Sequence, residues 1–119
     1  MPSPSDLPSV LAKLRVRYAA SSGETVAAFD GLAERLEAAP GEPAALTALR
    51  RELHRVHGTA GSYGFHEASR LAGSLEPVAT AWLTDPTLDL ARRGAIVRGF
   101  ARALQHALKP AAAPGATPP

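Results

Sequence analysis

Two histidines and two glycines in one short segment give the chain its clearest chemical signal. His54 and His57 lie three residues apart, Gly58 follows directly, and Gly61 comes almost one turn later. A glycine inside a helix costs about 1 kcal/mol relative to alanine. Its use beside a titratable imidazole indicates that another molecule must come close to that ring. The segment therefore predicts an exposed histidine that a second molecule uses.

The spacing of apolar residues predicts the helix that carries this segment. Its buried stripe recurs at three- and four-residue steps and consists of Leu46, Leu49, Leu53, Val56, Ala60 and Tyr63. At about 100° per residue, His54 lies about 130° from the middle of the stripe, and Gly58 shares its outer face. His57 falls at the boundary between stripe and surface. Three basic side chains surround His54 on the exposed side: Arg50, Arg51 and Arg55.

A metal site is the alternative chemistry for the two histidines. Spaced at i and i+3, they suit zinc, with His66 or Glu67 as a further ligand. Two ligands one turn apart recur often by chance, so we expect no metal. We also expect no nucleic-acid surface, because Glu52 interrupts the arginines.

Helical periodicity extends over most of the chain, with no strand pattern. A first helix, carrying Leu7 to Tyr18, is expected to break at 21–23, and a second carries Val26 to Leu36. The histidine helix follows as the third. A fourth covers 65–83, and Asp85 and Pro86 are expected to start a fifth that buries Leu90, Val97, Phe100, Leu104 and Leu108.

Short connections between long amphipathic helices predict an all-α fold, an antiparallel four-helix bundle with an additional N-terminal helix. We expect residues 1–109 to form this one domain. Residues 110–119, nearly all Pro, Ala and Gly, are expected to be a disordered tail.

Length and composition restrict the function classes. A chain of 119 residues, 45% of them hydrophobic, supports one core and leaves no room for an ATP-binding kinase domain besides. Thirteen Lys and Arg against eleven Asp and Glu give a formal net charge of +2, which indicates no nucleic-acid patch. There is no cysteine, and hence no disulfide or thiolate chemistry. Without a membrane span or signal-peptide pattern, we expect a cytoplasmic protein.

The third and fourth helices resemble a known family. The run His54, His57, Gly58, Gly64, Phe65 is similar to the active helix of histidine-containing phosphotransfer (HPt) domains. The stretch from Gly58 to Phe65 is especially similar to the phosphotransfer domain of chemotaxis histidine kinases, and Leu71 to Glu76 matches the Leu-rich stretch of the family.

This resemblance implies a phosphoryl carrier, not an enzyme with its own ATP site. His54 is the implied phosphoryl acceptor, exchanging the group between a histidine kinase or phospho-receiver and the aspartate of a response-regulator receiver domain. The receiver is expected to bring the Mg²⁺, so the chain itself needs no cofactor. Arg50, Arg51, Arg55, Gly58 and Gly61 form the implied binding surface, and a monomer suffices for this role.

One position departs from the pattern of the family. His57 stands where the family usually has lysine. An imidazole supplies positive charge only when protonated, whereas the neighbouring arginines always carry it. The departure favours an alternative, a non-phosphorylated helical adaptor that docks receiver or kinase domains. A third possibility is a structural bundle that mediates dimerisation.

Overall fold

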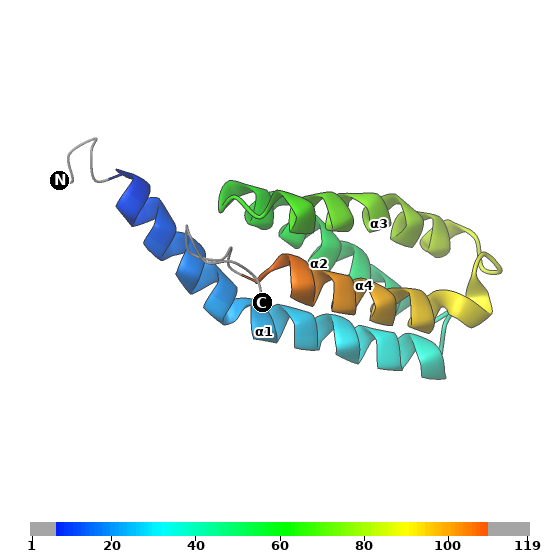
Figure 1. Ribbon diagram of the computed structural model, residues 1–119. Helices are drawn as coiled ribbons and strands as arrows, with labels where there is room; N and C mark the ends of the chain where they lie inside the picture. The colour runs from blue at the N-terminus through cyan, green and yellow to red at the C-terminus, as the bar shows by residue number, and fades with distance from the viewer. Residues whose placement is uncertain (1–6, 110–119) are drawn as a thin grey trace.

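Helices form nearly all of the computed structural model, which describes residues 7–109 (Figure 1). They are α1 (Leu7–Ala38), α2 (Pro43–Ser62), α3 (His66–Thr84) and α4 (Arg93–Ala107), with a short 3-10 helix, η2 (Leu90–Arg92), before α4. These residues contain no strand. The predicted all-α bundle is therefore confirmed. The predicted tail at 110–119 lies outside the described residues.

The core forms where two helix pairs meet. α2 packs mainly on α3, and α1 packs mainly on α4. Phe29 of α1 meets Phe100 of α4 edge to face, with ring centroids 4.9 Å apart. The stripe of α2 predicted from the sequence is buried through five of its members, Leu46, Leu49, Leu53, Val56 and Ala60. Because this stripe turns inward, the opposite side of α2 faces solvent. Over residues 7–109, no helix combines the length and the apolarity that crossing a bilayer requires.

The predicted break at residues 21–23 is wrong, because α1 runs continuously through them. The hydroxyls of Ser21 and Ser22 donate hydrogen bonds to the carbonyl oxygens of Tyr18 and Ala19, at 2.9 and 2.6 Å, so the serines bond within the helix instead of ending it. Tyr18 before the serines and Val26 after them both pack on the core, which also favours one continuous helix. The additional N-terminal helix is thus an extension of α1, and it projects past the end of the bundle (Figure 1).

The predicted start of the last helix is also wrong. The Asp85 carboxylate accepts hydrogen bonds from the backbone N–H and hydroxyl of Thr87 and from the N–H of Leu88, which closes a turn instead of capping a helix. These bonds lower the pKa of the Asp85 carboxyl. Asp89 then adopts a left-handed conformation (φ 54°), and Leu90, expected in the core, is exposed.

A buried arginine holds the ends of three segments together. Arg93, fully buried, donates from Nε to the carbonyl oxygen of Leu88, from Nη1 to that of Pro40 and from Nη2 to that of Asp85, at 2.9, 2.7 and 2.9 Å. Its guanidinium lies 5.4 Å from the ring centroid of Trp82. The arginine therefore fixes the α1–α2 connection and the loop before α4 at the same end of the bundle.

The other end of α2 closes with a glycine in the left-handed region. Gly64 has φ +86°, and the backbone N–H groups of Gly64 and Phe65 donate to the carbonyl oxygens of Gly61 and Ala60, at 3.1 and 2.9 Å. This pair of bonds is the Schellman motif, which glycine adopts at no steric cost. The turn brings α3 back along α2, so that residues of α3 lie beside the histidines.

Candidate functional site

His54 stands on the outer side of α2, with 81% of its side chain exposed. Its neighbour Leu53 is fully buried, so the one-residue offset along the helix turns the imidazole to solvent. The structure thus places His54 where the spacing predicts it.

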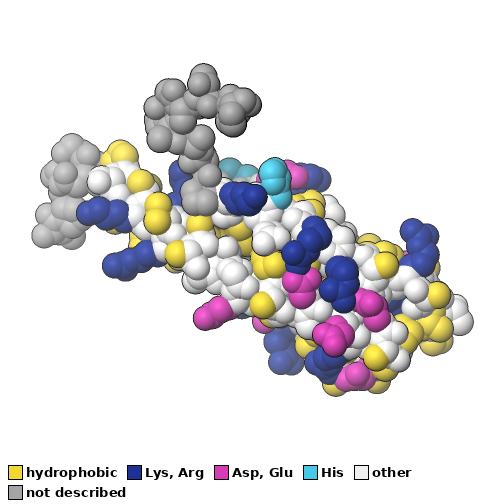
Figure 2. Space-filling model, turned by 60° about the horizontal axis from the view of Figure 1, so that its bottom comes forward, with side chains coloured by type: hydrophobic (Ala, Val, Ile, Leu, Met, Phe, Trp, Pro, Cys, Tyr) yellow, Lys and Arg dark blue, Asp and Glu magenta, His cyan; other side chains and the backbone are white. Residues whose placement is uncertain are grey.

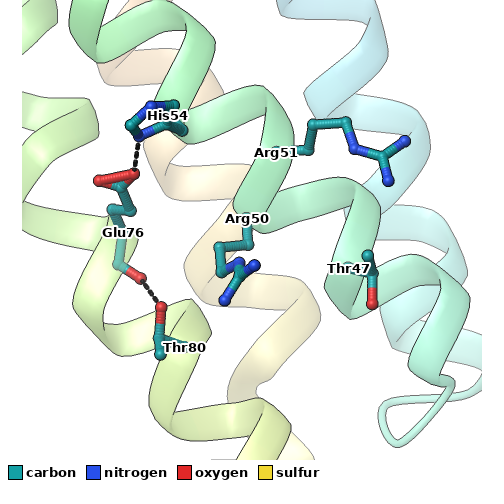
Figure 3. Close-up of a pocket in the computed structure, with 6 residues that line it drawn as sticks. All are labelled: Thr47, Arg50, Arg51, His54, Glu76 and Thr80. Carbon is teal, nitrogen blue, oxygen red and sulfur yellow. Dashed lines mark hydrogen bonds and ion pairs between the residues drawn. The ribbon is translucent and has the colours of Figure 1, made fainter.

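A carboxylate from α3 holds one nitrogen of this imidazole. Nδ1 of His54 lies 2.6 Å from Oε1 of Glu76 (Figure 3). Because an ionised carboxylate can only accept, Nδ1–H is the donor, and this contact favours the tautomer that carries the proton on Nδ1. In the neutral ring, Nε2 then carries the free lone pair. The arrangement leaves Nε2 as the ring nitrogen with an unengaged lone pair.

His54 and Glu76 border an open hollow of about 390 Å³ between α2 and α3. The hollow is lined by Thr47, Arg50, Arg51, His54, Glu76 and Thr80 (Figure 3). Within residues 7–109, neither Arg50 nor Arg51 has an ion-pair partner, whereas Glu76 contacts His54. Two guanidinium groups against one carboxylate give the hollow a positive balance. Such a surface suits a phosphoryl group, since guanidinium binds phosphate oxygens well.

The third predicted arginine does not join the hollow. Nη2 of Arg55 donates to Oε2 of Glu52 at 2.8 Å and to Oγ1 of Thr25 on α1 at 3.3 Å. The hydrogen bond that Arg55 donates to the Glu52 carboxylate raises the pKa of Arg55 despite partial burial. Arg55 therefore ties α2 to α1, and its charge is already paired.

His57 takes a different position from His54. Its Nδ1 lies 3.8 Å from Oε2 of Glu76, so one carboxylate stands between the two imidazoles. Its ring lies over Gly73 of α3, where a Cβ would sit 3.0 Å from Nε2. Nε2 of His57 thus packs against α3, while 51% of the side chain is exposed. The geometry thus distinguishes His54, with an open Nε2, from His57.

The two glycines of the motif also differ. A Cβ at Gly58 would meet nothing within 4 Å, so the surface beside His54 stays open. A Cβ at Gly61 would lie 3.2 Å from Oγ of Ser69, whose hydroxyl donates to the carbonyl oxygen of His57 at 2.7 Å. Gly61 is therefore a close-packing position between α2 and α3, whereas Gly58 belongs to the open surface.

The zinc alternative receives no support from the geometry. No group of three or more His, Cys, Asp and Glu side chains able to hold a metal occurs in the part of the chain that the structure describes. Glu67, one of the suggested ligands, instead pairs with Arg70, and this hydrogen bond lowers the pKa of the Glu67 carboxyl.

Sequence reasoning missed the role of Glu76 as the partner of His54. Glu76 follows His54 by 22 residues and lies on the next helix. The only signal in the sequence is its place at the end of the stretch similar to the family. Thr47 and Thr80, which complete the hollow, carry no sequence signal of their own.

Comparison with known families identifies one match. The family model described as "Hpt domain" matches residues 14–113, most of the chain and all of the site. Comparisons with curated proteins and with solved structures give no significant match.

Proposed function

Because the chain belongs to the Hpt domain family, whose members are phosphocarrier modules of two-component signalling, we propose that it carries a phosphoryl group on Nε2 of His54. The observation that supports this most directly is the pairing of an exposed imidazole with Glu76. His54 is 81% exposed, and its Nδ1 lies 2.6 Å from the carboxylate. The open nitrogen is thus both accessible and in the nucleophilic tautomer.

The transfer step follows from this tautomer. The Nε2 lone pair attacks the phosphorus of a donor, such as the phospho-aspartate of a receiver domain. A nitrogen–phosphorus bond forms while the bond to the leaving oxygen breaks, and the carboxylate leaves with the electron pair. The imidazole ring becomes positively charged because it keeps the proton on Nδ1. Glu76 stabilises that charge through the hydrogen bond from Nδ1.

The same contact serves the reverse step. When a receiver aspartate attacks the phosphorus, His54 must leave as a neutral imidazole that still carries its proton on Nδ1. Glu76 keeps the proton there in both directions. Arg50 and Arg51 line the hollow and supply positive charge for the phosphoryl oxygens. His57 takes the place of the usual lysine, and these arginines supply a permanent charge that His57 lacks.

The partner supplies the rest of the chemistry. We propose that the Mg²⁺ of this reaction comes with the receiver domain, whose carboxylates and the phosphoryl oxygens provide the hard oxygen ligands that it prefers. The chain itself positions the imidazole, fixes its proton and leaves the approach open at Gly58.

Labelling with phosphoramidate tests the acceptor. We expect wild type to gain one acid-labile phosphoryl group, seen by intact mass and by phosphorus NMR, and His54→Gln to gain none. His57→Gln, which changes the second imidazole of the same helix, is the matched control and should still be labelled. Labelling of His54→Gln would refute the assignment. If a receiver domain binds wild type and His54→Gln equally but neither is ever phosphorylated, the chain is an adaptor.

A further inference from the structure

The N-terminal part of α1 exposes apolar side chains beyond the bundle. In this α1 overhang, defined as residues 7–18, Val10, Leu11, Leu14 and Val16 are 37, 54, 37 and 58% exposed. Leu11, Leu14 and Tyr18 continue the buried stripe of α1 at three- and four-residue steps. The stripe therefore extends past the point where the bundle can cover it.

The overhang is fixed to the C-terminal end of α2, the helix that carries His54. Tyr18 stacks on Tyr63 with ring centroids 4.8 Å apart and packs on Phe65 at 5.6 Å. Nε of Arg15 donates to the carbonyl oxygen of Tyr63 at 3.0 Å. These contacts hold the overhang in a defined position relative to α2, so it can act as part of one surface with that helix.

A low surface leads from the imidazole to the overhang. His54, Gly58 and Ser62 are spaced by four residues and so follow one another along the exposed side of α2. Gly58 presents no side chain, and Ser62 presents only a hydroxyl that bonds back to the carbonyl oxygen of Gly58 at 3.1 Å. Beyond Ser62 lies a hollow of about 230 Å³, lined by Leu11, Arg15, Gly61, Ser62, Tyr63, Gly64 and His66. The exposed histidine and the exposed leucines thus border one continuous surface.

The charge of the overhang indicates what covers it. From Leu7 to Gly23 the chain carries Lys13, Arg15 and Arg17 and no acidic residue. In Figure 2 the projecting end of the molecule shows basic and apolar side chains, whereas acidic ones gather over the bundle. A second copy of the chain would bring like charges together around the leucines, which costs free energy. An apolar surface with an acidic rim is the complementary partner.

We propose that the α1 overhang and the low surface from His54 to Ser62 form one docking surface for the receiver domain that exchanges the phosphoryl group. The receiver approaches His54 with the carboxylates around its phosphoacceptor, which complement Arg50 and Arg51. Apolar side chains at the edge of the same receiver cover Leu11 and Leu14. This inference rests on the proposed function and adds a second contact that selects the partner.

Two variants of equal charge test the docking surface. Leu11→Glu with Leu14→Glu places acids on the proposed contact, and both positions are exposed, so folding should survive. The control is Ser9→Glu with Val16→Glu, at two exposed positions seven residues apart on the opposite side of the same helix. The organism's receiver domains are purified singly, and the one that takes the phosphoryl group fastest from labelled wild type is used. Transfer from each prephosphorylated variant and calorimetric binding of each unphosphorylated variant are then measured.

We expect Leu11→Glu with Leu14→Glu to lose at least about tenfold in both transfer rate and affinity for the receiver, and the control Ser9→Glu with Val16→Glu to lose less than about twofold. Equal transfer and affinity for wild type and for Leu11→Glu with Leu14→Glu would overturn the inference. So would unchanged affinity combined with a shift from dimer to monomer in light scattering, which would identify a second copy as the occupant. If labelled wild type passes its phosphoryl group to no receiver, the proposed function itself fails, a result distinct from the first two.

Discussion

Replacing Glu76 by alanine should slow the phosphorylation of His54 by a predictable factor. The change removes the acceptor that holds Nδ1–H at 2.6 Å, so the imidazole loses its bias toward the tautomer with a free Nε2. A hydrogen bond to a charged group contributes about 1.5–3 kcal/mol when shielded. An exposed ion pair contributes about 0.2–1 kcal/mol. The His54 side chain is 81% exposed and that of Glu76 only 23%.

With these exposures, we expect the contact to stabilise the reactive tautomer by about 1 kcal/mol, which corresponds to roughly a fivefold change in rate. Glu76→Ala should therefore label with phosphoramidate about fivefold more slowly than wild type. Glu76→Gln keeps an acceptor oxygen but loses the charge, so its rate should fall only about twofold. Glu67→Ala is the matched control, because Glu67 lies on the same helix but pairs with Arg70.

Initial labelling rates from phosphorus NMR give the kinetic test, and nitrogen NMR of the imidazole reports the tautomer directly. Circular dichroism checks that each variant is folded. A Glu76→Ala variant that labels at the wild-type rate would refute the reasoning, and so would a wild-type ring protonated on Nε2 instead of Nδ1. Complete loss of labelling in folded Glu76→Ala would contradict it in the other direction, since an orienting carboxylate accounts only for a partial effect.

Three further predictions concern stability. Gly58→Ala should raise the free energy of unfolding by about 0.5–1 kcal/mol, because the new Cβ meets nothing within 4 Å and alanine favours the helix. Urea unfolding measures this change, and a variant less stable than wild type would contradict the prediction. Arg93→Met should lower the free energy of unfolding by about 3 kcal/mol, since three carbonyl oxygens lose their donor. The melting temperature should therefore fall by more than about 10 °C, and a fall of less than about 3 °C would contradict the role of Arg93 in holding the segments together. The lowered pKa of Asp85 means that its stabilising effect is present above its unfolded pKa and is lost as the pH falls through the folded one. Between about pH 6 and 2.5, the melting temperature of Asp85→Asn should therefore fall less than that of wild type. An equal fall in both proteins would contradict the assignment.

Both errors in the predicted helix boundaries arise from polar or turn-forming residues. Ser21 and Ser22 favour a helix end in isolation, but their hydroxyls bond to the preceding turn while Tyr18 and Val26 pack on either side. The pattern at Asp85 and Pro86 predicts a helix cap, yet the Asp85 carboxylate closes a turn. In each case a local propensity worth a few tenths to about 1 kcal/mol was outweighed by packing and hydrogen bonding that the sequence does not display.

The helical period alone determined which side of α2 is buried and therefore that His54 is exposed, because residues within one helix have a fixed angular relation. The same reasoning identified the open position at Gly58. Only the tertiary structure decided that Glu76 holds His54, that Arg55 pairs elsewhere and that the α1 overhang is fixed to the end of α2. These contacts join helices whose relative register depends on how their side chains interlock, and no periodicity within a single helix specifies that register.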